Sequence, residues 1–503
     1  MGKGNRRLLV VLVAVLFVAI GVTQSVTDPG YFRIVEQSKK DPEGGAGELM
    51  VQLPGQFIVA SMAGFREVIA GALWIRADTF FHEGNYEAII PIVRLVTWFD
   101  PRNIDVYTTG AWHLDYNFVD DRTQLSDKRY IPASIALLKE GIRHNPDIWD
   151  LYFELGWTHY NKKLMDYEKA REYIELACTK PGRDPNTGRR TDRPEFVDRM
   201  LAHAYEKVGR FEDSIDQWHK ARKRVEDLIA RQKKQGADAF VDESSLDVCD
   251  RNLMMLYLRL GWRYGDMESY GKGVEIARRL ASRPNPPVLR WAAEGAERDY
   301  KARLAAGNPP ADALKPLDLG FDLDVKKIAP RVLMVKGKIN LVPASEYKDL
   351  ASEVFTHWYK DNAAADADRK QLWRDGCRVY WRLEDYDYVM PDLETFDWRI
   401  DMSKTVQWDS FYVAGGTFGS SADLIDISDP RAAKMYPLAS DRYRLTVWVT
   451  SQDPGCPDYV QDRVGWKGEA FRDKRYLDKK TMPGFTILRR EFVLDRDLNV
   501  ISD

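Results

Sequence analysis

The sequence predicts a multi-domain chain with an N-terminal membrane helix, then an α-solenoid of helical repeats, then an antiparallel β-sandwich. Three observations predict this fold class. An apolar run follows basic residues at the N-terminus, helical pairs recur with small and aromatic residues at fixed spacings, and the periodicity changes to that of strands after about residue 307. A length of 503 residues fits about two to four domains.

Composition narrows the function classes. Hydrophobic residues make up 44% of the chain and charged residues 30%, which is the balance of a folded protein. The formal net charge is −3 and the pI is near 6.3, so the chain has no overall basic field for collecting phosphates. A nucleic acid is therefore not expected as a partner.

Residues 1–26 read as a signal anchor or a signal peptide. Lys3, Arg6 and Arg7 precede an apolar run over residues 8–22. The length of the run suits an anchor and a cleaved leader alike. Because no clean small-x-small cleavage site follows a polar spacer, an uncleaved anchor is favoured.

The charge pattern also predicts the location of the chain. Basic residues flanking a membrane segment stay on the cytoplasmic side, and no second apolar span of about twenty residues follows. Residues 57–75 come nearest, but they carry Arg66 and Glu67 and suit an amphipathic helix. We expect a single-pass protein of the cytoplasmic membrane, with residues 27–55 as a linker and the bulk of the chain on the extracytoplasmic (periplasmic or cell-surface) side.

Residues 56–306 are predicted to form helical repeats. The clearest copy spans 194–223 and carries small and aromatic residues at regular positions: Leu201, Ala202, Tyr205, Gly209, Phe211, Ser214, Trp218 and Ala221. Residues 148–181 match if the turn is lengthened by two residues. Two further copies lie upstream, at about 80–101 and at 107–146, the latter with a long polar insertion between its helices. Helical periodicity continues to about residue 304 without the pattern, as in degenerate or capping repeats.

On these positions, residues 64–223 resemble the tetratricopeptide-repeat superfamily. The segments Gly64–Glu67, Ala70–Asp78, His82–Gly84, Thr97–Pro101 and Ala111–Asn117 also resemble a group of uncharacterised membrane-anchored bacterial repeat proteins. The resemblance implies a right-handed superhelix whose concave face holds peptides or protein segments. It implies no catalytic residues.

The second half has the pattern of strands. Residues 307–328 are predicted as a linker and 329–503 as a β-sandwich-like domain, immunoglobulin-like or jelly-roll-like. The predicted strands are rich in β-branched and aromatic residues and are bounded by Gly, Pro, Asn and Asp: 331–342, 377–383, 410–414, 443–450 and 485–494.

Motifs for catalysis and metal binding do not fit their templates. The four cysteines include no CxxC pair, and His82-Glu83 lacks the second histidine of HExxH. Gly271-Lys272 has neither the spacing nor the following Ser or Thr of a phosphate-binding loop. We therefore expect no catalytic residues, no metal and no cofactor.

An acidic and aromatic stretch gives the β domain an alternative role. Carboxylates at Glu384, Asp385 and Asp387, with Tyr386 and Trp398 nearby, could bind calcium or stack on sugars. Solvated loop carboxylates are the simpler interpretation. The alternative prediction is a glycan-binding or glycan-modifying envelope protein acting through this domain.

The main prediction is a non-enzymatic scaffold or assembly protein. Four aromatic residues of the array are candidate partner contacts: Tyr107, Trp112, Tyr116 and Trp149. The expected partners are proteins of an envelope, pilus, secretion or surface assembly, and the chain itself could be a subunit of such a complex.

Overall fold

A computed structural model describes most of the chain beyond residue 64. It covers 65–119, 125–184, 189–235, 244–288, 290–307, 320–339, 378–393, 399–413, 417–418, 424–453 and 464–502. The predicted leader (1–26) and first linker (27–55) lie outside the described residues. Within the described ranges, no helix combines the length and the apolar character needed to cross a membrane.

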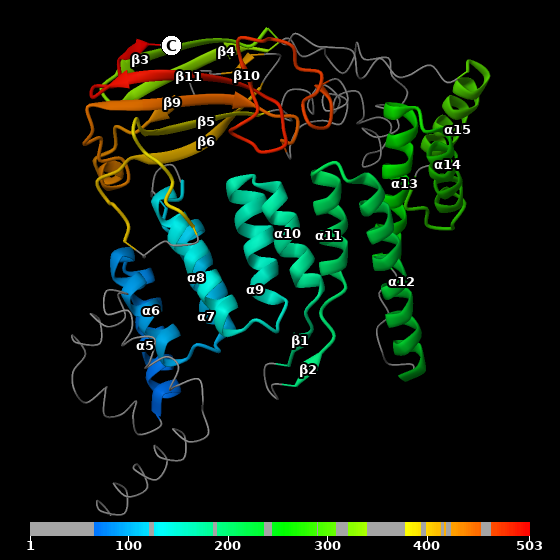
Figure 1. The fold of residues 1–503 in the computed structure, drawn as a ribbon, viewed down its shortest axis with the longest axis horizontal. Coiled ribbons are helices and arrows are strands. Elements are labelled where there is room, and N and C mark those ends of the chain that lie inside the picture. Colours follow the sequence, from blue (N-terminus) through cyan, green and yellow to red (C-terminus); the bar gives the residue numbers. More distant parts are fainter. Residues whose placement is uncertain are drawn as a thin grey trace, which may run out of the picture. The chain divides into compact units, whose positions relative to one another are not determined.

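Helices precede antiparallel sheets along the chain, so the order α then β is confirmed (Figure 1). The chain divides into two compact units. The first unit comprises Met1–Glu154 and Val389–Asp401, and the second comprises Leu155–Tyr388 and Met402–Asp503. This division differs from the predicted domains, because the later helices share a compact unit with the sheets.

The first unit contains short helices joined by tight turns. They are α5 (Arg66–His82), η2 (Tyr86–Ala88), α6 (Ile89–Phe99), α7 (Ile104–Trp112), η3 (His113–Asn117), η4 (Lys128–Tyr130), α8 (Ile131–His144) and α9 (Asp150–Phe153). Asp100-Pro101 follows α6, and Asn103 caps α7 by accepting a hydrogen bond from the Val106 amide at 3.3 Å. These helices lie in the region that the sequence predicts to be helical.

Glycine allows close helix packing in the first unit. A Cβ atom at Gly141 of α8 would lie 2.7 Å from the Tyr107 ring of α7 and 3.0 Å from Leu151 of α9. Tyr107 therefore fills the space that a side chain at position 141 would occupy. A small residue on α8 thus complements an aromatic residue on α7.

The helices of the second unit are longer. They are η5 (Glu154–Leu164, which starts at the unit boundary), α10 (Tyr167–Cys178), α11 (Phe196–Lys207), α12 (Phe211–Gln235), α13 (Ser244–Tyr264), α14 (Met267–Ala281) and α15 (Arg290–Ala305), with a small hairpin of β1 (Gly182–Arg183) and β2 (Arg190–Thr191). Gly209 (φ +72°) and Gly265 (φ +74°) end α11 and α13 in the left-handed region. Asp266 then caps α14 through the Ser269 amide.

Buried charge links three of these helices. Asp250 of α13 is 1% exposed, and it pairs with Arg222 of α12 at 2.7 Å and with Arg279 of α14 at 3.2 Å. Because an unpaired buried carboxylate would be strongly unfavourable, these contacts favour one arrangement of α12, α13 and α14.

The strands of the second unit form two larger sheets. They are β3 (Asp322–Ala329), β4 (Val332–Lys338), β5 (Arg378–Asp385), β6 (Val406–Tyr412), β7 (Thr417–Phe418), β8 (Leu424–Asp426), β9 (Arg442–Val449), β10 (Leu477–Asp478), β11 (Ile487–Asp495) and β12 (Val500–Ser502). The short helix η8 (Pro430–Lys434) lies between β8 and β9. One sheet has the order β10-β11-β9-β5-β6, with β12 beside β11; the other has the order β3-β4-β7, with β8 also paired to β4.

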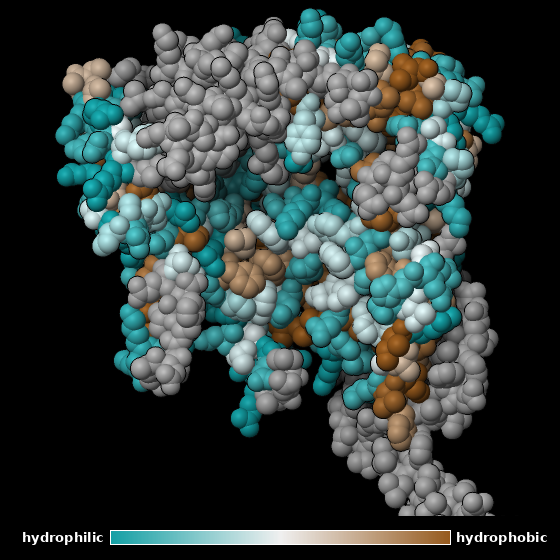
Figure 2. Space-filling model, turned by 180° about the vertical axis from the view of Figure 1, so that it is seen from behind, coloured by the Kyte–Doolittle hydropathy of each residue, from teal (hydrophilic) through white to brown (hydrophobic). Residues whose placement is uncertain are grey.

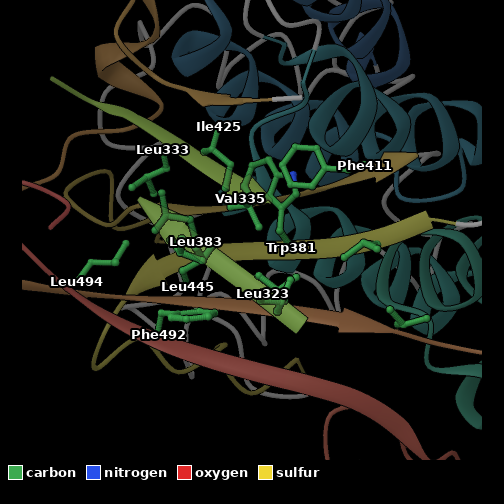
Figure 3. Close-up of a cluster of buried hydrophobic side chains, with 14 of the residues drawn as sticks. Leu323, Leu333, Val335, Trp381, Leu383, Phe411, Ile425, Leu445, Phe492 and Leu494 are labelled. Carbon is green, nitrogen blue, oxygen red and sulfur yellow. The ribbon is translucent and has the colours of Figure 1, made fainter. Parts of the chain in front are cut away.

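Both sheets contribute to one hydrophobic core (Figure 3). Leu323, Leu333 and Val335 come from the smaller sheet, and Trp381 and Leu445 come from the larger one. Alternate residues of β3 are buried, and this strand lies largely within the predicted linker 307–328. The linker prediction therefore misses a strand, because its short alternation of Leu323 and Val325 is interrupted by charged residues.

Candidate functional site

The helices and the larger sheet of the second unit meet in a buried apolar cluster. Tyr167 of α10 contacts the Phe485 ring edge-on at 5.5 Å, and Tyr380 of β5 stacks on Trp448 of β9 at 5.6 Å. The whole cluster is Tyr167, Val208, Tyr380, Trp448, Met482, Phe485 and Ile487. Burial of this much aromatic surface stabilises the packing of α10 and α11 against the sheet.

Hydrogen bonds also connect the C-terminal end of α11 to the loops that follow β9. Lys207 Nζ donates to the backbone oxygen of Gln452 at 3.2 Å and to its side-chain oxygen at 3.0 Å. Trp466 Nε1 donates to the backbone oxygen of Lys207 at 3.2 Å, and Gln452 Nε2 donates to the backbone oxygen of Trp466 at 2.6 Å. These three residues thus bind the segment around 466 to the C-terminus of α11.

Trp466 also contacts two further helices. Phe211, the first residue of α12, meets its ring edge-on at 5.4 Å. The guanidinium groups of Arg259 and Arg263 in α13 lie 4.8 Å and 5.6 Å from the Trp466 ring centroid. Such cation–π contacts are strongest where water is excluded, and Trp466 is only 6% exposed.

A groove of about 870 Å³ opens beside Trp466. Its helical wall comes from the start of α12, the C-terminal end of α13 and the start of α14, and the segment 466–469 supplies the remaining side. Aromatic lining residues are Phe211, Tyr257, Tyr264 and Trp466. The volume lies in the range of about 300–1,000 Å³ that is usual for ligand sites, so we take this groove as the candidate site.

Polar groups of the groove are partly paired with one another. Arg210 donates to Asp213 at 2.7 Å, and Lys272 pairs with Glu268 at 2.7 Å. His219 lies 3.2 Å from the Tyr257 hydroxyl. The groove therefore combines an aromatic surface with a charged rim.

Burial affects the titration of two lining groups. The pKa of His219 is lowered chiefly by burial, which disfavours the imidazolium form. The pKa of Tyr264 is raised chiefly by burial, so its hydroxyl is neutral at physiological pH. The aromatic surface therefore carries no charge of its own near pH 7.

The four predicted partner contacts lie in the first unit and differ in exposure. Tyr107 is fully buried against Gly141, so it has no free surface for a partner. Trp112 is 45% exposed and stacks on Tyr116 at 6.5 Å. Trp149 is half-buried and contacts Phe153 at 5.7 Å. Trp112 and Tyr116 thus form a small aromatic surface, while Tyr107 belongs to the core.

Histidine is a common metal ligand, and two histidines of the array, His82 and His113, both contact the Phe81 ring. The described part of the chain contains no group of three or more metal-ligating side chains. His159, in η5, is fully buried, and burial together with Lys163 lowers its pKa to about 3. This histidine is neutral inside the protein.

The acidic stretch of the β domain is largely engaged in structural contacts. Glu384 accepts a hydrogen bond from Arg444 at 2.7 Å. Asp385 accepts from the Thr405 amide and from the Ser440 hydroxyl. Both carboxylates are at most 5% exposed. Residues 394–398 of the same stretch lie outside the described residues.

Helix α5 carries a different exposed surface. Val68 and Ile75 are 67% and 70% exposed and lie seven residues apart, so they share one helical face. Figure 2 shows apolar surface at lower right, where α5 lies. The exposed apolar surface of Val68 and Ile75 belongs to one helix, whereas residues of three helices and a loop line the groove.

The sequence does not single out the groove residues as a site. Tyr257 and Tyr264 lie seven residues apart in a stretch where the repeat pattern is lost, which is a weak local signal for a shared face. Trp466 follows them by about two hundred residues, and no spacing rule connects it to the helices.

Comparisons with known proteins do not add a functional assignment. No family model matches the chain, and a search of curated proteins finds no relative.

Proposed function

We propose that this protein is a non-enzymatic scaffold that binds other proteins on the extracytoplasmic side of the membrane. In this proposal the N-terminal segment is the membrane anchor, the helices form a tetratricopeptide-like solenoid, and the two sheets form a β-sandwich. The partners would belong to an envelope, pilus, secretion or surface assembly. The observation that carries the proposal is the aromatic groove beside Trp466.

Several properties of the groove favour a polypeptide ligand. Its volume would take the side chains of a few residues. Its aromatic residues are large and have few rotatable bonds, so they lose little entropy when they contact a partner. Tyr264 is 43% exposed and is available as such a contact.

The packing around the groove holds its wall in place before a partner binds. Trp466 is fixed by its hydrogen bond to Lys207 and by its contacts with Phe211 and Arg259. A preformed wall lowers the ordering cost of binding. The groove is therefore better suited to a defined partner than a surface of mobile side chains would be.

Site-specific photocrosslinking in native membranes tests the binding function. A photoreactive phenylalanine analogue replaces Tyr264 in one full-length variant and Tyr412, which is 50% exposed on β6, in a control. We expect a protein adduct of defined mass from position 264 that is missing from position 412. Identical adducts from both positions, or none from position 264, would contradict binding at the groove.

A second experiment tests the location. Alkaline phosphatase fused after Asp503 folds only when it is exported, so we expect an active fusion that remains in the membrane fraction. A control lacking residues 1–26 should be inactive. An inactive full-length fusion, with an active cytoplasmic reporter at the same position, would contradict the extracytoplasmic location.

A further inference from the structure

We propose that the groove beside Trp466 selects a cationic segment of a partner protein, one that presents lysine or arginine side chains. This inference rests on the proposed binding function and specifies the chemistry of the ligand. It follows from the charges that line the groove, from which of them are already paired, and from the aromatic surface next to them.

Negative charge predominates in the lining. Three cationic side chains, Arg210, Lys272 and Lys467, face twice as many carboxylates. The carboxylates are Glu212, Asp213, Asp216, Asp266, Glu268 and Glu469. Because a partly enclosed groove focuses the field of its charges, this excess favours a positively charged ligand.

Four of the six carboxylates have partners within the protein. Asp213 and Glu268 pair with Arg210 and Lys272. Asp266 caps α14, and Glu469 accepts a hydrogen bond from the Lys467 amide at 2.8 Å. These contacts within the protein account for the presence of the four carboxylates, so none of them requires a ligand.

Glu212 and Asp216 differ from the other four. They are exposed, they lie one turn apart on α12, and neither forms a hydrogen bond or ion pair with a residue that the structure describes. Glu212 is in the first turn, where the helix dipole stabilises an acidic residue. Asp216 lies beyond that turn, so its position in the groove has no such explanation.

An aromatic surface accompanies these carboxylates. Arg259 and Arg263 already lie near the Trp466 ring, and Lys272 lies 5.9 Å from the Tyr257 ring centroid. The exposed Tyr264 ring offers a further surface for the stem or head of a long cationic side chain. Asp216 and Glu212 would then compensate its charge.

Selection from a displayed library of random peptides tests the inference with the full-length protein in mild detergent. Each selected peptide is measured against the wild type, Tyr264→Ala and Asp216→Asn. Asp227→Asn is the matched control, because Asp227 is exposed on the same helix, about three turns beyond Asp216, and does not line the groove. Circular dichroism verifies that each variant is folded.

We expect the peptides that depend on Tyr264 to be enriched in lysine and arginine. Their affinity should fall about three- to fivefold in Asp216→Asn, remain unchanged in Asp227→Asn, and weaken with added salt. A larger loss is expected when Glu212→Gln is combined with Asp216→Asn.

Other results would separate the two proposals. Peptides that depend on Tyr264 but show no cationic excess, or that ignore Asp216→Asn, would overturn the charge selectivity and leave the binding function standing. A selection without any Tyr264-dependent peptide would overturn both. Peptides that match this chain's own basic segment 231–234 would indicate a second copy as occupant and overturn the assignment to a partner protein.

Discussion

Two aromatic surfaces of the protein are built in different ways. Trp112 and Tyr116, in the first unit, lie one turn apart across the junction of α7 and η3, and they stack on each other. The groove of the second unit joins Phe211, Tyr264 and Trp466 from two helices and a loop after β9. One surface is local to a helix, and the other exists only when distant segments are packed together.

This difference has consequences for stability and for binding. A local pair on a helix surface can be removed with little effect on the rest of the fold. A residue that closes a groove between distant segments contributes to packing as well as to binding. Substitutions should therefore have a larger effect on stability at the groove than at the local pair.

Trp466→Ala should have the largest effect. The change removes a side chain that is 6% exposed, its contacts with Phe211 and Arg259, and its hydrogen bond to Lys207. We expect a loss of about 3–5 kcal/mol in the free energy of unfolding, measured by urea denaturation, and loss of groove binding. Trp466→Phe keeps an aromatic ring but loses the indole N–H and part of the buried volume, so it should lose about 2 kcal/mol. An unchanged midpoint in Trp466→Ala would show that the loop is not packed on the helices.

Gly261→Ala tests the helical wall of the groove. A Cβ atom here would lie 2.9 Å from the Tyr270 Cα of α14, so α13 and α14 would have to separate. We expect a loss of about 3 kcal/mol in the free energy of unfolding. Gly71→Ala is the matched control in the first unit, because nothing lies within 4 Å of its Cβ position; it should gain about 0.5–1 kcal/mol. Equal effects of the two substitutions would contradict the close approach of α13 and α14.

The sequence predicts local features of this protein well. The repeat spacing at 194–223 predicts α11, the turn at Gly209 and the start of α12, and five predicted strands match β4, β5, β6, β9 and β11. These features depend on periodicity and on turn residues within a few positions of each other. The tetratricopeptide resemblance and the anchor remain predictions.

The groove could not be predicted in the same way. Trp466 lies in a loop without periodicity, and its contacts with Lys207 and Arg259 join segments more than two hundred residues apart. Tyr107 shows a different limit of the sequence, because aromatic character alone does not distinguish a core residue from an exposed one. The sequence predicts Tyr107 as a partner contact, whereas the structure buries it against Gly141.

A buried histidine of the second unit makes the stability of the protein depend on pH. His159 of the second unit is fully buried with a pKa lowered to about 3, whereas an unfolded histidine titrates near 6.5. Between these values the unfolded chain binds a proton that the folded protein does not, so this residue makes stability fall as the pH decreases. From pH 7.5 to pH 5 its contribution should be a loss of about 2 kcal/mol in the free energy of unfolding.

Unfolding of His159→Gln across this pH range measures that contribution by difference. The variant should show a flatter dependence on pH than the wild type. Parallel curves for the wild type and His159→Gln would contradict the burial of a neutral imidazole.

Trp112→Ala should have the smallest effect on stability. Trp112 is 45% exposed, and it contacts Tyr116 and His113, its neighbours on the same helical stretch. We expect a change of less than about 0.5 kcal/mol in the free energy of unfolding. Copurification from native membranes then reports on binding alone, because the fold is intact. Loss of a partner in Trp112→Ala would assign the local pair a binding role of its own, and retention of every partner would show that binding does not depend on this pair.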